Sequence, residues 1–473
     1  MMTLIKNIFS ALLVFFAFLS CSDEPITKNN EWDQVDKIIS EIKLPIIPSK
    51  QFSLVDFSSL EALKQNIRPY LNKAIEDISK DGGGKIIIPK GEYFSKGPIH
   101  LKSNIHLHFE DGVVIKFSNN PKDYLPVVFT RWEGVECYNY SPLIYAYDQE
   151  NIAITGNAVL DGQADNEHWW PWKGKTEYGF KKGMPSQLDE YARPRLLKLD
   201  EEQVDVSKRI FGEGYYLRPN FLQLYKCKNI LLSDIKLTNS PMWVIHPVLC
   251  ENVTIRNVKS ISHGPNSDGC NPESSRNVLI EDCYFDNGDD CIAIKSGRNF
   301  DGRRIATPSE NIVIRNCVMK DGHGGVVIGS EVSGGCRNVF AEKCKMDSPN
   351  LDRMLRIKSN SLRGGFVENI FVRDIEVGTV SNAIFLIELL YEMKEGEKGN
   401  FPPTVRNIHV ENVKSNKSEY GLQLIGIDNP PIEEIYISNC EFNNVEKGNI
   451  LQNVKSITLN NVKINGEVIK AIK

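Results

Sequence analysis

The chain has 473 residues, of which 41% are hydrophobic and 25% are charged. Its formal net charge of −5 and its pI near 6.0 leave no basic field for nucleic acid, so we expect no nucleic-acid partner. No apolar stretch reaches the roughly 20 residues that a membrane-spanning helix needs, which excludes a multi-span membrane protein.

The first 21 residues, MMTLIKNIFSALLVFFAFLSC, place one lysine before a short apolar run and predict an export signal. The end of this segment resembles a bacterial lipoprotein signal, although leucine is more usual where Phe18 stands. The resemblance implies lipidation of Cys21 and a membrane anchor. Residues 22–24 (SDE) look like the export tag of Bacteroidetes surface lipoproteins, which implies an outer-membrane or cell-surface location, with the periplasmic face as a second option. A cleaved signal with an incidental cysteine is the alternative.

Residues 22–48 are predicted to form a tether to a folded domain that spans 49–473. A helix is predicted at about 60–79. The stretch KDGGGKIIIPKGEYFSKGPIHLKSNIHLHFEDGVVIKF (80–117) has the period-two alternation of strands. We expect the helix and these strands to start and cap the domain.

The stretch 163–219 is rich in charged and aromatic residues and is predicted to be a long inserted loop. It contains WWPWK (169–173). Trp169, Trp170 and Trp172 could stack on sugar rings or anchor the loop, and the sequence does not choose between these roles.

From residue 229 onward, one seven-residue pattern returns at steps of 23, 25, 34, 27, 31 and 38 residues. The second and fourth positions are apolar, so each copy holds a short strand with one face turned inward. The copies are NILLSDI (229–235), NVTIRNV (252–258), NVLIEDC (277–283), NIVIRNC (311–317), NVFAEKC (338–344), NIFVRDI (369–375) and NIHVENV (407–413).

Repeated strands without helical periodicity between them predict a solenoid in which each coil covers its neighbour. We predict an all-β chain, a single-stranded right-handed parallel β-helix. The asparagine that opens each copy would stack into a ladder of side-chain amides. A β-sandwich is the alternative, but the hairpin signals that it needs are scarce.

Ten cysteines follow Cys21, and in an exported protein they could pair. Cys283, Cys317, Cys344 and Cys440 recur at one position of the repeat, where a small apolar side chain packs well. We therefore expect most cysteines to be packing residues, although the sequence does not fix their pairing.

Polar residues of successive copies fall on one column. Counted from the first asparagine of its own coil, Asp268 lies 16 residues on, Asp289 and His323 lie 12 on, and Arg356 lies 18 on. These side chains are therefore expected to stack along one flank of the solenoid and to line a groove there. Asp290 joins them because the preceding glycine permits a bend.

Three carboxylates in one groove suit acid–base hydrolysis of a glycosidic bond, in which one carboxyl donates a proton and another activates water. One of them must stay protonated, and a neighbouring carboxylate raises a pKa for that purpose. Alternation in LRIKSN (355–360) turns Arg356 and Lys358 to the same face. Such a pair suits the carboxylate of an acidic sugar.

These residues form four ordered motifs, which resemble the signatures of the polygalacturonases, glycoside hydrolase family 28, over about residues 50–465. The motifs are Asn266-Ser267-Asp268, Gly288-Asp289-Asp290, Gly322-His323-Gly324 and Arg356-Ile357-Lys358. The first usually has threonine where Ser267 stands. The resemblance implies a pectin lyase-like right-handed parallel β-helix and inverting hydrolysis of α-1,4-galacturonosyl bonds in pectin without a metal or another cofactor.

The resemblance also implies roles for single residues. Asp289 would be the general acid, Asp268 and Asp290 would hold and activate the water, and His323 would support protonation of the acid. Arg356 and Lys358 would bind the galacturonate carboxylate.

Weaker candidates for substrate binding lie close by in the sequence. Asn266 belongs to the first motif. Trp243 and His246 precede Asp268 by one coil, and His263 precedes Gly264. Each has the alternative of simple packing.

Competing functions follow from the same residues. A pectate lyase would use Asp289 and Asp290 to hold Ca²⁺, and a non-catalytic carbohydrate-binding β-helix would not need three converging carboxylates.

Within the family, three inserted segments are expected to close one end of the groove, which favours exo release of galacturonic acid. They are the insert 163–219, RNFDGRRIATPSE (298–310) and YEMKEGEKGNFPP (391–403). Rhamnogalacturonan or a branched pectin is the alternative substrate, and the chain is expected to be a monomer.

Overall fold

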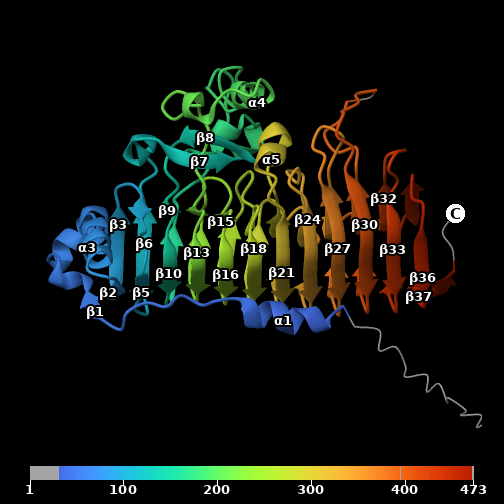
Figure 1. Cartoon of the computed structure of the whole chain (residues 1–473), viewed down its shortest axis with the longest axis horizontal. Helices are drawn as coiled ribbons and strands as arrows, with labels where there is room; N and C mark the ends of the chain where they lie inside the picture. The colour runs from blue at the N-terminus through green and yellow to red at the C-terminus, as the bar shows by residue number, and fades with distance from the viewer. Residues whose placement is uncertain (1–30, 395, 471–473) are drawn as a thin grey trace, which may run out of the picture.

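The computed structural model describes residues 31–394 and 396–470 (Figure 1). The predicted signal with Cys21 and the predicted export tag at 22–24 lie outside the described residues. Within the described ranges, no helix is both long and apolar enough to cross a bilayer.

Strands of successive coils stack into long parallel sheets that run the length of the molecule (Figure 1). The first sheet has 13 strands: β1 (Gln51–Ser53), β2 (Gly84–Ile88), β5 (Ile105–Phe109), β10 (Glu150–Thr155), β13 (Lys228–Ser233), β16 (Glu251–Arg256), β18 (Arg276–Glu281), β21 (Ser309–Arg315), β24 (Cys336–Glu342), β27 (Phe366–Arg373), β30 (Thr404–Glu411), β33 (Glu433–Ser438) and β36 (Ile457–Asn460).

The second sheet also has 13 strands, and its last pair is antiparallel. It consists of β3 (Gly91–Ser95), β6 (Val113–Phe117), β11 (Ala158–Asp161), β14 (Lys236–Thr238), β17 (Lys259–Ser262), β19 (Tyr284–Asn287), β22 (Val318–Met319), β25 (Lys345–Met346), β28 (Glu376–Thr379), β31 (Lys414–Lys417), β34 (Glu441–Phe442), β37 (Val462–Ile464) and β38 (Glu467–Ile469).

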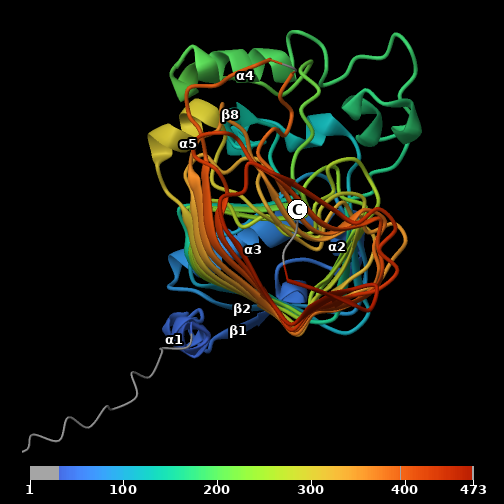
Figure 2. The ribbon, with the colours of Figure 1, turned by 90° about the vertical axis from the view of Figure 1, so that its right-hand side faces the viewer.

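The third sheet is divided into two parts. One part holds β4 (Ile99–His100), β9 (Ile144–Tyr147), β12 (Leu222–Tyr225) and β15 (Ile245–Val248); the other holds β20 (Ile292–Ile294), β23 (Val326–Ile328), β26 (Arg353–Lys358), β29 (Ala383–Glu388), β32 (Tyr420–Ile425) and β35 (Asn449–Gln452). Single bridges at Cys270 join β15 to β20. Seen along the axis, the sheets enclose one core (Figure 2), and the predicted parallel β-helix is confirmed.

The repeat dictates which side chains fill this core. In β18, Val278 and Ile280 occupy the second and fourth positions of the repeat and are fully buried. Their register partners, Val253 on β16 and Ile312 on β21, are buried as well. Each coil therefore covers the apolar residues of the next, which is the main stabilising contribution in a solenoid.

The predicted asparagine ladder runs along the first sheet. Each side-chain Nδ2 donates to the Oδ1 of the preceding asparagine, at distances between 2.7 and 3.5 Å. The ladder comprises Asn104, Asn151, Asn229, Asn252, Asn277, Asn311, Asn338, Asn369 and Asn407. All of them have positive φ, a conformation that asparagine tolerates better than most residues. The ladder thus explains why asparagine recurs at this position.

Helices close the N-terminal end of the solenoid. The single helix predicted at 60–79 is two helices, α2 (Leu60–Gln65) and α3 (Arg68–Lys80). A proline follows Arg68 in the first turn of α3, where the missing N–H costs nothing. α3 buries Leu71 and Ile75 against the first coils.

The ten cysteines of the described ranges are all free and buried.

The prediction of a tether is wrong for residues 31–41. Helix α1 (Asp33–Glu41) lies along the outside of the first sheet (Figure 1). Its Val35 and Ile38 pack against a stripe of outward-facing apolar side chains. That stripe consists of Leu279, Val313, Phe340 and Phe371. The apolar third position of some repeats is the signal for this contact, because an outward strand position is otherwise polar.

Inserted elements rise from one side of the solenoid (Figures 1 and 2). They include the antiparallel hairpin β7 (Val128–Trp132) and β8 (Val135–Asn139). The predicted insert 163–219 separates β11 from β12 and contains η3 (Trp170–Lys173), η4 (Thr176–Tyr178), α4 (Arg193–Glu201) and η5 (Val206–Lys208). Helix α5 (Asn299–Ile305) belongs to a second insert. Two further short 3₁₀ helices, η1 (Leu54–Asp56) and η2 (Pro121–Tyr124), lie in the N-terminal part of the chain.

Candidate active site

The predicted column of polar residues exists and lies where the second sheet turns into the third. Asp268 follows β17, Asp289 and Asp290 stand between β19 and β20, and His323 stands between β22 and β23. Arg356 lies on β26. Because parallel strands repeat at a spacing of roughly 4.8 Å, these turns stack and bring their side chains together.

The column lines a pocket with a volume of about 590 Å³. Its lining is strongly charged and includes residues from the inserts as well as from the solenoid. The lining residues are Glu133, Lys173, Lys175, Gln187, Leu188, Arg193, Trp243, Asn266, Asp268, Asp289, Asp290, Lys295, Arg298, His323, Ser330, Glu331, Asp352, Arg353, Arg356, Lys358, Tyr391 and Glu392.

The first motif fastens its turn to the next coil. The buried Ser267 hydroxyl donates to the carbonyl oxygens of Ser262 and Gly264 and accepts from the backbone N–H of Gly288 at 3.1 Å. The hydroxyl makes these bonds where the family pattern has threonine. Gly288 is required for close approach, because a Cβ there would stand 2.6 Å from the Gly264 carbonyl oxygen. The chain also bends at Gly288 and Asp289, as predicted, so the bend and this close contact together explain the glycine.

Asp268 is a buried carboxylate, and only one of its two oxygens has side-chain partners in the described ranges. Its Oδ2 accepts a hydrogen bond from Asn271 Nδ2 at 2.7 Å and lies 3.6 Å from Lys295 Nζ. Burial first, and the nearby Asp289 carboxylate second, raise the pKa of Asp268 to about 7. The carboxyl is therefore poised to change its charge near neutral pH.

Asp289 and His323 form an ion pair at the centre of the pocket. His323 Nδ1 lies 3.0 Å from Asp289 Oδ1, which also accepts from the backbone N–H of Asp290. Burial alone would raise the pKa of Asp289, but His323 and the cations Lys358 and Arg356 outweigh it and hold that pKa well below its usual range. The hydrogen bond to Asp289 raises the pKa of His323 to about 9. At neutral pH the pair carries one proton, on the imidazole.

The two cations of the fourth motif are joined to the second motif. Lys358 Nζ lies 2.8 Å from Asp290 Oδ2, and Nη1 of Arg356 lies 3.4 Å from Asp290 Oδ1. Both cations lie over the ring of Tyr391, at 5.5 and 5.3 Å from its centroid for Arg356 and Lys358 respectively. The ring thus fixes where the two cations stand.

Asn266 of the first motif meets two cations. Its Oδ1 accepts from Lys173 Nζ at 2.7 Å and from Arg218 at 2.9 Å. Arg218 is fully buried and also donates to the carbonyl oxygens of Pro241 and Pro265. Asn266 lines the pocket as predicted, and its side chain connects the insert to the solenoid.

The tryptophans of the insert are structural anchors. Trp169 is 2% exposed and packs edge-on against Tyr124 and Trp172. Trp170 Nε1 donates to the carbonyl oxygen of Ser240 at 2.9 Å. The choice that the sequence left open is therefore decided for anchoring, since these contacts are internal to the protein.

A network of ion pairs around the buried Arg298 forms one wall of the pocket. Nη1 of Arg298 lies 3.2 Å from Glu331 Oε1 and 3.9 Å from Oε2 of Glu133, which stands at the tip of the β7–β8 hairpin. Glu133 pairs with Arg193 of α4 at 2.6 Å. Arg298 also reaches Glu392 at 3.4 Å. All three segments that were expected to close the groove, at 163–219, 298–310 and 391–403, thus meet in this wall.

The prediction that His246 lines the groove is wrong. His246 is fully buried, with Nε2 2.7 Å from Glu273 and Nδ1 bonded to Asn220 and Gln223. Its neighbour Trp243 lies above it and lines the pocket as predicted. The hairpin β7–β8 explains the difference, because Gln223 and Glu273, which bond to His246, also bond to Thr130 and Arg131 of that hairpin. His246 is therefore covered by the hairpin.

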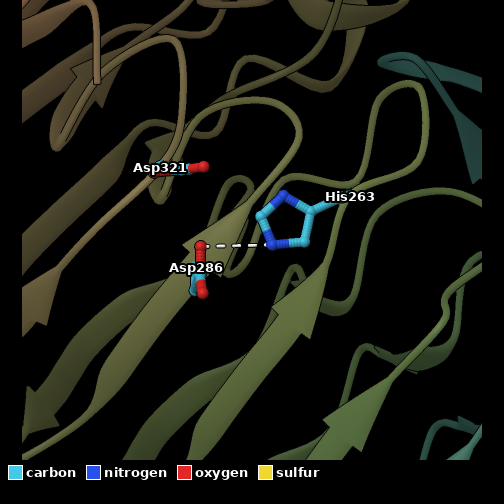
Figure 3. Close-up of side chains that lie close together, drawn as sticks. All are labelled: His263, Asp286 and Asp321. Carbon is cyan, nitrogen blue, oxygen red and sulfur yellow. Dashed lines mark ion pairs between the residues drawn. The ribbon is translucent and has the colours of Figure 1, made fainter. Parts of the chain in front are cut away.

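The prediction that His263 lines the groove is also wrong. His263 lies outside the pocket and points toward Asp286, with Nε2 3.2 Å from Oδ1 (Figure 3). Asp321 stands across from them, and its carboxylate accepts from Ser348 and Asn350. These three residues are the one group in the described ranges that could present three metal ligands together. That group does not include Asp289 or Asp290.

Several residues that line the pocket were not predicted from the sequence. Lys295 lies 4.8 Å from the ring of Trp243 and pairs with Glu331 at 3.1 Å. Lys173 and Tyr391 come from inserts that lie far from the motifs in sequence. For Lys295 the signal was available, because it follows the second motif at an alternating strand position.

The arrangement is suited to acid-catalysed hydrolysis of an anionic chain. It offers an ionisable carboxyl beside a second carboxylate that shares a proton with histidine, as general acid–base chemistry requires. It also offers a fork of two cations for a carboxylate ligand.

Comparisons with known proteins agree with this chemistry. The family model described as "Glycosyl hydrolases family 28" matches residues 212–465. A solved exopolygalacturonase from Thermotoga maritima is 45% identical, with 93% of this chain and 97% of that chain covered and a TM-score of 0.88. A "Probable polygalacturonase" from Vitis vinifera is 28% identical over 82% of this chain and 73% of its own length. An "Exo-poly-alpha-D-galacturonosidase" from Dickeya chrysanthemi is 25% identical over 77% of this chain and 62% of its own length.

Proposed function

The chain belongs to the glycosyl hydrolases of family 28, as its four motifs predict, and on that premise we propose that it hydrolyses α-1,4-galacturonosyl bonds of pectin from the chain end and releases galacturonic acid. The observation that carries this proposal is the cluster of Asp268, Asp289 and Asp290 beside Arg356 and Lys358 in one pocket. It combines a hydrolytic centre with a binding site for a sugar carboxylate.

Asp289 is the proposed general acid, with His323 as its proton store. The imidazolium at 3.0 Å keeps one proton beside the carboxylate. When negative charge builds on the leaving oxygen, the proton passes from His323 to Asp289 and from Asp289 to that oxygen, which leaves His323 neutral and Asp289 ionised.

Asp268 and Asp290 are the proposed holders of the attacking water. In the described ranges, Asp268 Oδ1 makes no hydrogen bond while Oδ2 is occupied by Asn271. Asp290 is kept in place by Arg356 and Lys358. Attack by water from the face opposite the acid inverts the anomeric carbon.

Exo action is supported by the wall of ion pairs around Arg298. A wall at one end of the pocket leaves room for a chain terminus and not for a chain that passes through. The similarity to the Thermotoga maritima exopolygalacturonase points the same way, since the two chains match over nearly their whole lengths.

Export and lipid anchoring are part of the proposal and rest on the signal-like segment that ends at Cys21. A polymer such as pectin must be met outside the cytoplasm. Metabolic labelling with a palmitate analogue tests the anchor, because Cys21→Ser should abolish incorporation of the label. Incorporation by the Cys21→Ser chain would contradict lipidation at this residue.

Incubation with polygalacturonate tests the reaction class. A hydrolase releases reducing ends without the ultraviolet absorbance of unsaturated uronates, whereas a lyase produces both. The anomer formed first, followed by proton NMR, reports inversion. Unsaturated ends as the main product would contradict the proposal.

A further inference from the structure

One cation of the pocket has no carboxylate partner. Lysines and arginines line the pocket on every side, and in the described ranges all but Lys173 have a carboxylate oxygen within 4.0 Å. The paired ones are Lys175, Arg193, Lys295, Arg298, Arg353, Arg356 and Lys358. A half-buried ammonium without a counter-ion is costly unless a ligand supplies the negative charge.

Lys173 is held firmly in this position. Its Nζ donates to Asn266 Oδ1 at 2.7 Å. It ends the short helix η3, whose position is fixed by the buried Trp169 and by the hydrogen bond from Trp170 to Ser240. The contacts of Trp169 and Trp170 therefore fix the position of Lys173 in the pocket.

Two carboxylates near Lys173 favour its charged form against burial and the neighbouring cations Arg218 and Arg193. Burial lowers the pKa of Lys173, and the carboxylate of Glu133 opposes that shift, as does the carboxylate of Asp289. Both carboxylates act on Lys173 from beyond ion-pair distance. The ammonium thus stands close to the proposed general acid while its remaining N–H donors are free for a ligand.

Two cationic binding sites flank Asp289 along the solenoid axis: Lys173 forms one, and Arg356 with Lys358 forms the other. Lys173 is bonded to Asn266, in the turn one coil before Asp289. Arg356 and Lys358 lie on β26, two strands beyond β20 in the order β20–β23–β26. A chain cleaved at Asp289 therefore meets one cationic binding site on each side of the broken bond.

We infer that Lys173 binds the carboxylate of the terminal galacturonate, while Arg356 and Lys358 bind the carboxylate of the next sugar. This inference rests on the proposed function. It assigns the enzyme to homogalacturonan, in which both sugars at the cleaved bond carry a carboxylate. In the alternating backbone of rhamnogalacturonan, one of those two sugars is neutral and leaves one cationic binding site without a partner.

The test compares two substrates with four proteins. The substrates are trigalacturonate and the same trisaccharide with a methyl ester on its non-reducing terminal sugar. The proteins are the wild type, Lys173→Gln, Lys173→Arg and the control Lys182→Gln, which removes an exposed charge from the same insert.

We expect the wild type to favour the free acid in kcat/KM by about 10- to 100-fold. Lys173→Gln should lose that preference by losing activity on the free acid alone. Lys173→Arg should retain most of it, and Lys182→Gln should behave as the wild type.

Three outcomes overturn the inference. A wild-type protein that releases no galacturonate overturns the proposed function together with the inference. If Lys173→Gln prefers the free acid over the methyl ester as strongly as the wild type does, the inference is overturned and the proposed function stands. An equal loss on both substrates assigns Lys173 a structural role and overturns the inference as well.

Discussion

The imidazole of His323 lies 3.0 Å from the carboxylate of Asp289, and the two residues share one proton in the centre of the pocket. The partner raises the pKa of His323 to about 9, while the pKa of Asp289 stays low. We therefore propose that the acid function of this site belongs to the pair, since neither residue alone would keep a proton ready beside the substrate.

The pH dependence of kcat/KM should report this pair together with Asp268. Asp268 activates water only when it is ionised, so activity should rise as pH passes through about 7. The pair donates only while His323 is protonated, so activity should fall above about pH 9. A profile measured on trigalacturonate checks both limbs. In His323→Gln the alkaline limb should disappear and kcat should fall roughly 100-fold; an unchanged alkaline limb would contradict the role of His323.

Asp289→Asn should abolish turnover while substrate still binds. The change preserves shape but removes the group that passes on the proton, so kcat should fall by at least about 1,000-fold with little change in affinity. Isothermal titration with trigalacturonate measures the binding. Asp286→Asn is the matched control, because Asp286 faces His263 outside the pocket (Figure 3). Preserved activity in Asp289→Asn would remove Asp289 from the mechanism.

Asp268→Asn should stabilise the fold at high pH. The pKa of Asp268 is raised in the folded state, from an unfolded value of about 3.9 to about 7, so its penalty on folding begins as pH rises past about 4 and is complete above about pH 7. We expect a gain of about 2 kcal/mol at about pH 8 that shrinks by about pH 5. Urea denaturation at the two pH values measures it. Equal gains at both pH values would show that ionisation of Asp268 is not the cause.

Asn277 tests the ladder. Asn277→Ala removes the hydrogen bonds to Asn252 and Asn311 and places alanine at a φ of 56°. We expect a loss of about 2–3 kcal/mol in the free energy of unfolding. Asn277→Gly keeps the backbone conformation at lower cost and should lose about 1–2 kcal/mol. Equal losses in the two variants would assign the whole effect to the side-chain bonds.

The wall tests exo action. Arg193→Met removes the ion pair with Glu133, and the end of the pocket should then open. We expect oligomers to appear beside galacturonic acid in early products, and kcat/KM on trigalacturonate to fall roughly tenfold. Lys198→Met on the exposed face of α4 is the control. Unchanged products from Arg193→Met would show that the wall does not set the mode of attack.

The sequence predicted the parts of the molecule that repeat. The period-two alternation and the recurring asparagines specify the strands, the ladder and the column that brings Asp268 to Asp289. These features depend on local patterns, which a single sequence displays. The family motifs then supplied the roles that spacing alone left open.

The sequence did not predict what depends on contacts between distant segments. α1 was expected to be a tether because its partners, such as Phe340 and Phe371, lie about 300 residues away. His246 and His263 were assigned to the groove by proximity in sequence, whereas the β7–β8 hairpin covers His246 and its polar partners, and His263 points toward Asp286. Lys173 could be placed only when the fold of its insert was known.

The most direct test of the central claim is the time course of products from an oligogalacturonide in the presence of EDTA. The wild type should release galacturonic acid from the first time point, without unsaturated ends and without intermediate oligomers in excess. A ladder of shorter oligomers at early times would contradict exo action. No release of galacturonic acid at any time would contradict the assignment of the pocket as a galacturonan hydrolase.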